Sequence, residues 1–162
     1  MILEVGALAL PFTLLAIDGG EYTLPRDLER RPAVLAFFKT TCATCDVTFP
    51  YLNRLRDAYP DGWRLWAIAQ DPPDRARDYA ARFQITYPVL IDAPQYTVSK
   101  LYDPPATPTL FLIGPDGRIE YTTHGFAKVD LNDLAARLAG HLGVKAQIVA
   151  PAGDGQPDFK PG

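Results

Sequence analysis

The sequence lacks the features of membrane-spanning and nucleic-acid-binding proteins. None of its apolar runs reaches the roughly 18 residues that a transmembrane helix needs. Lys and Arg number 16 against 19 Asp and Glu, and the cationic residues form no basic stripe. We therefore expect neither a membrane nor a nucleic acid as a partner. No internal repeat is visible, and a chain of 162 residues is long enough for one domain with an ordinary hydrophobic core.

Metal-ligating side chains are also scarce. The chain has two cysteines, Cys42 and Cys45, and two histidines, His124 and His141. A structural zinc ion needs four ligands at a recognisable spacing, and these four residues do not have one. We therefore expect no bound metal.

The N-terminal region has no clear secretory leader. Residues 5–17 are mostly apolar, but no Lys or Arg precedes them, and Glu4 stands where positive charge is expected. Pro11 interrupts the run, so we interpret it as the start of the folded domain. If Met1 is the natural start, the protein is expected in the cytoplasm. A leader removed from the natural protein would instead indicate a periplasmic or extracytoplasmic location.

The two cysteines form a single Cys-x-x-C motif, Cys42-Ala43-Thr44-Cys45. It follows an apolar run at 33–38 that predicts a buried strand, and it precedes a predicted helix at 46–59. This junction is typical of redox-active dithiols. The free N–H groups at a helix start favour the reactive thiolate of Cys42, and Cys45 is close enough to close a disulfide. The alternative is a pair of buried packing cysteines.

The rest of the chain alternates between predicted strands and helices. We expect strands at 12–17, 21–23, 63–69, 88–91, 109–113 and 118–123, and helices at 74–83, 97–102 and 130–142. This order predicts an α/β fold with helices on both faces of the sheet, whose site lies beyond the carboxyl ends of the strands. Residues 1–143 would form the domain and 144–162 a Gly/Pro-rich tail, extended or disordered from residue 150 onward.

Several motifs together resemble a known family. Around the cysteines stand Phe37-Phe38 and Phe49-Pro50, and further on come Gln70-Asp71, Pro88-Val89-Leu90-Ile91-Asp92 and Thr107-Pro108-Thr109, the last before an apolar strand. These residues resemble the thioredoxin superfamily, and within it the TlpA/ResA-like thiol–disulfide oxidoreductases, with a redoxin (AhpC/TSA-like) domain. The resemblance covers about 3–142. It implies a thioredoxin-like fold, in which a central mixed sheet is flanked by helices and extended by an N-terminal hairpin.

The resemblance also implies roles for Thr107 and Pro108. In this family the proline is cis and packs beside the dithiol, and the backbone of the residue before it pairs with the substrate chain. By resemblance, Pro108 and Thr107 take these roles here.

Three positions depart from the family pattern. Thr41 replaces the usual Trp before the first cysteine, while Ala36 and Thr48 replace acids that help to deprotonate the second. Asp46, Lys39 and Asp71 are candidate replacement bases, although an exposed, solvated charge is the favoured interpretation of each. Thr44, inside the motif, and Gln70, after the second central strand, complete the set of supporting residues.

The leading functional hypothesis is a thiol–disulfide oxidoreductase that reduces protein or small-molecule disulfides, fed by an upstream dithiol donor. It would need no cofactor beyond a Cys42–Cys45 disulfide, and we expect a monomer. One alternative is a peroxiredoxin-like thiol peroxidase. However, the Thr and Pro that such a site needs upstream of its cysteine are replaced by Lys39 and Leu35, counted from Cys42. Another alternative is a thioredoxin-fold binding module whose dithiol is a redox sensor.

Overall fold

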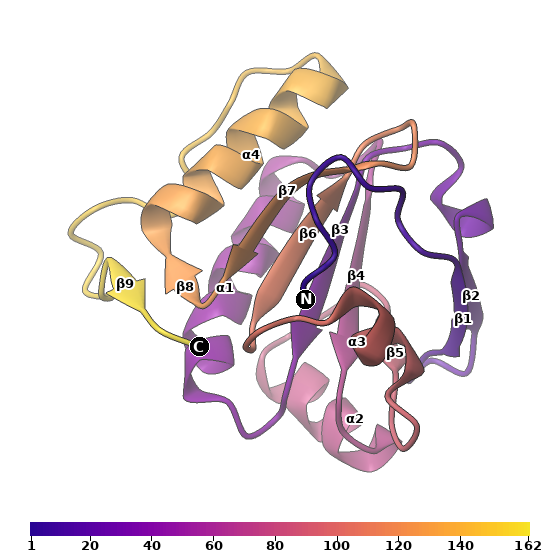
Figure 1. The fold of residues 1–162 in the computed structure, drawn as a ribbon. Helices are drawn as coiled ribbons and strands as arrows, with labels where there is room; N and C mark the ends of the chain where they lie inside the picture. Colours follow the sequence, from indigo (N-terminus) through magenta and orange to yellow (C-terminus); the bar gives the residue numbers. More distant parts are fainter.

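A mixed five-stranded β-sheet forms the centre of the protein in the computed structural model, which describes residues 1–162 (Figure 1). Its strands are β3 (Ala33–Phe38), β4 (Arg64–Ala69), β5 (Val89–Ile91), β6 (Thr109–Ile113) and β7 (Ile119–His124). They lie in the order β5-β4-β3-β6-β7. β3, β4 and β5 are parallel, whereas β6 is antiparallel to β3 and β7 is antiparallel to β6. The prediction of an α/β fold is confirmed.

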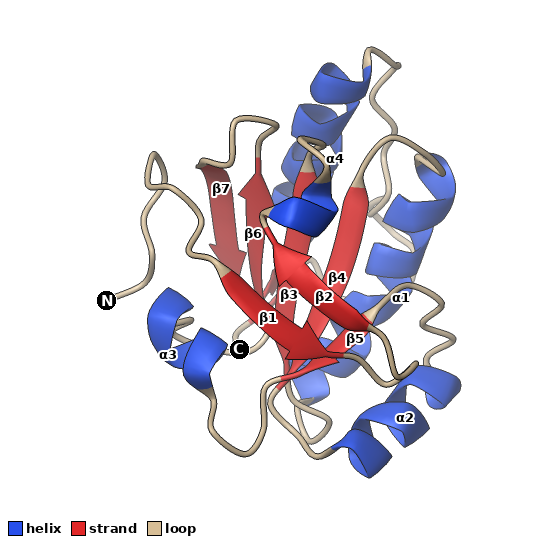
Figure 2. Ribbon diagram, turned by 90° about the vertical axis from the view of Figure 1, so that its right-hand side faces the viewer, coloured by secondary structure: helices blue, strands red, loops and turns tan.

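Helices cover both faces of the sheet (Figure 2). They are α1 (Ala43–Ala58), α2 (Pro73–Arg82), α3 (Thr97–Tyr102) and α4 (Lys128–Leu142), with a short 3-10 helix at Arg26–Leu28. Successive residues of β3 point to opposite faces. Val34, Ala36 and Phe38 join one buried cluster with α1, α2 and α4, while Leu35 and Phe37 join a second with α3. This explains why β3 is apolar at every position. No helix combines the length and the apolar character that crossing a membrane requires.

The N-terminal hairpin consists of β1 (Phe12–Leu15) and β2 (Glu21–Leu24), which pair antiparallel as predicted. Its apolar face covers the second cluster, in which Phe12 and Leu24 are buried. Trp66 of β4 contacts the rings of Phe12 and Tyr22 at centroid distances of 6.3 and 5.5 Å. The hairpin is therefore part of the hydrophobic core on that side.

The sequence predicts an extended or disordered tail at 150–162, and the structure excludes the disordered form because these residues are ordered against the domain. After α4 the chain doubles back, and β9 (Phe159–Lys160) pairs antiparallel with β8 (Phe126–Ala127). Figure 1 shows this yellow segment running back past α4 to the start of α1. Hydrophobic patterning missed it because most of its side chains are exposed. The domain boundary at residue 143 stays a prediction.

Candidate functional site

Cys42 is the N-cap residue of α1. Its backbone is extended, with φ −107° and ψ 109°, and its sulfur accepts a hydrogen bond from the backbone N–H of Cys45 at 3.1 Å. The helix therefore begins at Ala43, earlier than the predicted 46, because the cysteine side chain satisfies one of its free N–H groups. Cys42 is half-buried and Cys45 is fully buried, so of the two residues only Cys42 is partly exposed to a substrate.

The loop before β6 lies against Cys42. The Cys42 thiol donates a hydrogen bond to the carbonyl oxygen of Thr107 at 3.3 Å, across 65 residues of sequence. The Thr107–Pro108 peptide bond is cis, as the resemblance implies. Thr109, the first residue of β6, anchors the loop through a hydrogen bond from its hydroxyl to the carbonyl of Ala106 at 2.6 Å. The fold thus brings together the dithiol and the Thr107–Pro108 pair.

Burial dominates the electrostatics of Cys45. Loss of solvent raises the pKa of this thiol, and the hydrogen bond with Cys42 raises it further, while the backbone N–H of Lys39 acts in the opposite direction. Cys45 is consequently held as a neutral thiol at neutral pH. The two cysteines therefore differ in exposure, although only two residues separate them.

Asp71 fixes the loop that leads into the motif. Its carboxylate accepts hydrogen bonds from the backbone N–H of Thr40 at 2.8 Å and from the Thr40 hydroxyl at 2.9 Å. The prediction of an exposed charge at Asp71 is wrong: its side chain is buried, because both bonds from Thr40 replace its water. Asp71 is thus placed to position the Thr40–Thr41 backbone just before Cys42.

The other predicted supporting residues surround this loop without forming one cluster. Lys39 and Thr41 are exposed, and the Gln70 amide donates a hydrogen bond to the Ser99 hydroxyl at 3.0 Å. Asp46 is half-buried at the start of α1. Its carboxylate accepts hydrogen bonds from the Tyr79 hydroxyl at 3.0 Å and from Arg82 at 3.4 Å.

Ala36 and Thr48 stand at the two positions where the family resemblance implies an acid. Ala36 lies fully buried in β3. The Thr48 hydroxyl donates a hydrogen bond to the carbonyl of Thr44, one turn earlier in α1, at 2.8 Å. The rings of Phe38, Phe49 and Tyr79 belong to the same buried cluster as Cys45. The inner sulfur therefore has an apolar environment.

Sequence reasoning missed one part of the site, the end of the C-terminal segment. The Thr44 hydroxyl donates a hydrogen bond to the carbonyl of Pro161 at 2.6 Å. A Cβ placed on Gly162 would lie 2.8 Å from the Thr107 carbonyl oxygen. Thr44 is buried in consequence. No sequence signal marks this contact, because a backbone carbonyl makes it.

The histidines lie apart from the dithiol. His141, in α4, contacts the Glu120 carboxylate at 2.6 Å, and His124 ends β7 with an exposed side chain. No three His, Cys, Asp or Glu side chains are grouped so that they could hold a metal ion.

Comparison with known proteins shows that the chain is similar to thiol–disulfide exchange proteins. The profile of the AhpC/TSA family matches residues 5–122. The chain is 32% identical over 118 residues to the thiol-disulfide oxidoreductase ResA of Geobacillus thermodenitrificans, covering 72% of this chain and 67% of that one. For the ResA of Geobacillus kaustophilus, identity is 32% over 123 residues, covering 75% of this chain and 70% of the relative.

A solved structure shows the same fold. It is described as a thiol:disulfide interchange protein DsbE from Chlorobium tepidum, and it superposes with a TM-score of 0.78 at 26% identity. The match covers 86% of this chain and 99% of that structure. The predicted thioredoxin-like fold with an N-terminal hairpin is confirmed.

Proposed function

The chain belongs to the AhpC/TSA family and is a thiol–disulfide oxidoreductase, and we propose that it works as a reductase whose Cys42–Cys45 dithiol transfers two electrons to a disulfide substrate. The observation that carries this proposal is the contrast between the two sulfurs. Cys42 is accessible and receives an N–H bond at the start of α1, whereas Cys45 is buried directly behind it. That asymmetry supports attack by Cys42 and resolution by Cys45.

The first step is attack by Cys42. Its thiol loses a proton to solvent, and the thiolate attacks one sulfur of the substrate disulfide. The substrate S–S bond breaks, a new bond joins Cys42 to one substrate sulfur, and the other substrate sulfur leaves as a thiolate that takes up a proton. The N–H of Cys45, 3.1 Å from the Cys42 sulfur, stabilises negative charge there before the attack.

The second step is resolution by Cys45. Its thiol loses a proton and attacks the sulfur of Cys42, which releases the second substrate thiol and leaves a Cys42–Cys45 disulfide. Burial opposes this deprotonation because it raises the pKa of Cys45. Since Asp46 is engaged by Tyr79 and Arg82, and Asp71 by Thr40, we propose that water admitted with the substrate accepts the proton.

A dithiol donor must then reduce the Cys42–Cys45 disulfide, so that each cycle moves two electrons from donor to substrate. We propose that the internal disulfide is the only redox group and that the substrate is a protein or small-molecule disulfide. A cytoplasmic reductase also needs a reduction potential near that of thioredoxin, about −270 mV. A potential near −120 mV would instead indicate an oxidant that forms disulfides.

The test is reduction of insulin and of oxidised glutathione with dithiothreitol as donor. Cys42→Ser should abolish turnover with both substrates, whereas Cys45→Ser should accumulate a mixed disulfide visible by mass spectrometry. Because serine at this buried position could disturb folding, Cys45→Ala serves as a second resolving variant. Wild-type turnover by Cys42→Ser would contradict the assignment of the nucleophile.

Two further measurements separate the alternatives. Peroxide consumption without disulfide reduction would indicate a thiol peroxidase, and a dithiol that oxidises without turnover would indicate a sensor. In the wild-type protein, the mixed disulfide should also resolve faster as pH rises above 7, because the raised pKa of Cys45 leaves little thiolate at neutral pH. A resolution rate independent of pH would contradict rate-limiting deprotonation of Cys45.

A further inference from the structure

Residues 149–162, called here the C-terminal strap, begin at a firm anchor on α4. Val149 and Ala150 are buried, and their backbone N–H groups donate to the Asn132 side-chain oxygen at 3.1 and 2.9 Å. The Asn132 amide nitrogen in turn donates to the Ala150 carbonyl at 3.0 Å. One side chain therefore satisfies three backbone groups and fixes where the strap leaves the core.

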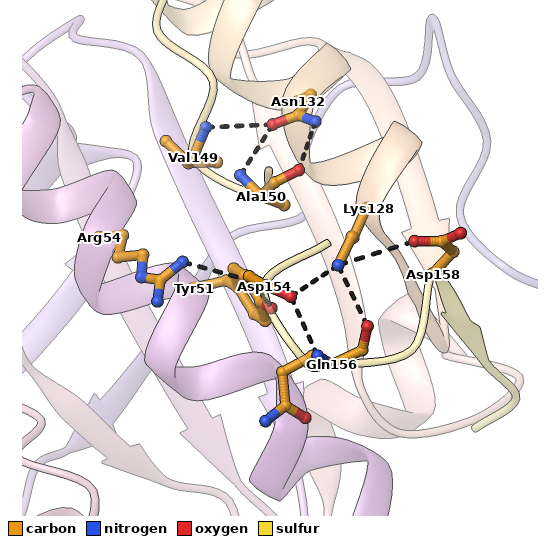
Figure 3. A network of polar contacts seen from close by, with 9 residues as sticks. All are labelled: Tyr51, Arg54, Lys128, Asn132, Val149, Ala150, Asp154, Gln156 and Asp158. Carbon is orange, nitrogen blue, oxygen red and sulfur yellow. Dashed lines mark hydrogen bonds and ion pairs between the residues drawn. The ribbon is translucent and has the colours of Figure 1, made fainter. Parts of the chain in front are cut away.

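A buried lysine holds the middle of the strap (Figure 3). The Lys128 side chain is only 6% exposed, and its ammonium group lies 2.7 Å from Asp154 and 3.1 Å from the carbonyl of Gln156. Arg54 and the Tyr51 hydroxyl, both on α1, also contact Asp154. Hydrogen bonds from Lys128, from the Tyr51 hydroxyl and from the backbone N–H of Gln156, in that order of size, lower the pKa of Asp154. The strap thus bridges α4 and α1 through one carboxylate.

Beyond Asp154 the backbone of the strap passes close to Gly125, where the absence of a side chain allows the approach. Gly125 has a φ of +71°, and a Cβ on it would lie 3.0 Å from the Gly162 nitrogen and 3.1 Å from the Lys160 carbonyl. Its own N–H donates to the carbonyl of Pro108 at 2.8 Å. Gly125 therefore joins the Thr107–Pro108 loop to the strap at close range.

The end of the strap lies on the same groups that define the site. Pro161 accepts the hydrogen bond from Thr44, inside the Cys-x-x-C motif. Gly162 packs against Ala106 and the Thr107 carbonyl, each 2.8 Å from a Cβ placed on that glycine. The Thr107 carbonyl also accepts the hydrogen bond from the Cys42 thiol. The strap thus reaches both the dithiol helix and the loop that the resemblance assigns to the substrate chain.

We propose that strap residues 159–162 occupy the position of an extended polypeptide substrate beside Thr107, so that small disulfides reach Cys42 directly whereas polypeptide disulfides must displace the strap. The proposal rests on the proposed function and adds a substrate preference to it. Cys42 stays half-exposed while the strap is closed, and a small disulfide needs no pairing with Thr107. A polypeptide that pairs with this backbone would collide with Pro161 and Gly162.

The forces that hold the strap allow such displacement. Between 151 and 162 its residues are exposed or half-exposed, and its attachment is mainly polar. Polar contacts exchange for water at modest net cost, so a segment held in this way opens without global unfolding. A closed strap lowers the apparent affinity for its competitor to the intrinsic affinity multiplied by the open fraction.

The experiment loosens the strap at two separate points. Asp154→Asn removes the carboxylate that pairs with Lys128, and Gly162→Val places methyl groups against Thr107 and Ala106. Asp74→Asn is the matched control, because it removes one carboxylate from α2 where the side chain is 96% exposed. Hydrogen exchange of peptides covering 154–162 reports release of the strap in each variant.

Turnover is then measured with insulin and with oxidised glutathione. If the strap is closed about nine-tenths of the time, its release should raise kcat/KM for insulin about tenfold. The value for glutathione should remain within about twofold, and Asp74→Asn should behave as wild type. A released strap with unchanged insulin turnover would overturn the proposal. So would a strap that stays protected in both variants, because these contacts would then not hold it.

Alkylation of Cys42 gives a readout that does not depend on turnover. N-ethylmaleimide should react equally with wild type and both strap variants, whereas a maleimide on a long polyethylene glycol chain should react faster with the variants. If wild type reduces neither disulfide but this contrast appears, the proposed function fails and the screening by the strap stands. If the contrast is absent while turnover is normal, the strap inference fails alone.

Discussion

The N-terminal hairpin and the C-terminal strap both lie outside the central sheet, but different forces hold them. The hairpin buries Phe12 and Leu24 and packs aromatic rings against Trp66. The strap, beyond Ala150, is held by ion pairs, by hydrogen bonds and by the two-residue strand β9. Each is a short two-stranded addition by topology, yet the strap residues beyond Ala150 add nothing to either apolar cluster, whereas the hairpin does.

This difference separates a structural segment from a movable one. Burial of apolar area stabilises by roughly 25 cal/mol for each Å² removed from water, and that gain is lost only when the cluster opens. Opening the strap returns the Lys128 and Asp154 charges to water, and this solvation offsets the loss of their ion pair, so the strap can open alone. We therefore expect the hairpin to unfold with the domain and the strap to open before it.

The largest expected effect comes from Trp66, beneath the hairpin. Trp66→Ala removes a side chain that is 2% exposed and leaves a cavity, which should lower the free energy of unfolding by about 3–5 kcal/mol. The measurement is chemical denaturation followed by circular dichroism. Leu15→Ala is the control, since Leu15 lies in the same hairpin but is 61% exposed. A loss below about 1 kcal/mol for Trp66→Ala would mean that the hairpin is not part of the core.

An intermediate effect is expected at Asn132, where the strap meets the core. Asn132→Ala leaves three backbone groups without their partner and should cost about 1–3 kcal/mol, together with faster hydrogen exchange from residue 149 onward. Asn132→Asp keeps the oxygen that accepts from Val149 and Ala150 and should cost less. Equal losses in the two variants would show that the bond to the Ala150 carbonyl carries the anchor.

The smallest expected effect is a loss of folding stability at alkaline pH. It is tested with one tyrosine from each region, Tyr22 in the hairpin and Tyr51 under the strap. The hydrogen bond to Asp18 raises the pKa of Tyr22 to about 12 in the hairpin, and burial and the bond to Asp154 raise that of Tyr51 to about 12 under the strap. Because each folded pKa exceeds the unfolded value of about 10, stability is retained below pH 10 and falls as pH rises towards 12.

Replacing either tyrosine with Phe removes its share of this fall, which denaturation at pH 9, 10 and 11 would measure. If the strap opens alone, Tyr51 ionises in the open form, and Tyr51→Phe should flatten the pH dependence of global unfolding less than Tyr22→Phe does. Equal flattening would indicate that hairpin and strap unfold together.

The regularly patterned parts of this fold were predictable from the sequence. The apolar run of β3, the Cys-x-x-C at its end and the Gly114–Gly117 turn between β6 and β7 each depend on local signals that survive in the folded protein. The strap was not predictable in this way. Its contacts are single polar atoms on distant elements, such as Lys128 with Asp154, and they leave no periodic trace.

The site shows the same division. Spacing alone identified Cys42 and Cys45, but the approach of Thr107 to Cys42 came only from the family resemblance, because the two residues are 65 positions apart in the sequence. Asp71 was expected to be solvated, since nothing in its neighbourhood reveals that Thr40 would bind it from another loop. Tertiary contacts of this kind depend on how strands align, which local sequence does not report.

Because Cys45 is fully buried in the larger apolar cluster, its oxidation state and the folding stability of the chain are linked in one thermodynamic cycle. Any stability that the closed disulfide adds to the folded chain, relative to the open dithiol, must reappear as a lower reduction potential than that of the same two cysteines in the unfolded chain. A core substitution beside this sulfur therefore tunes the protein as a reductant even when it touches no substrate. The melting temperatures of the oxidised and reduced forms, measured side by side, would report how far folding shifts the reduction potential of the Cys42–Cys45 pair.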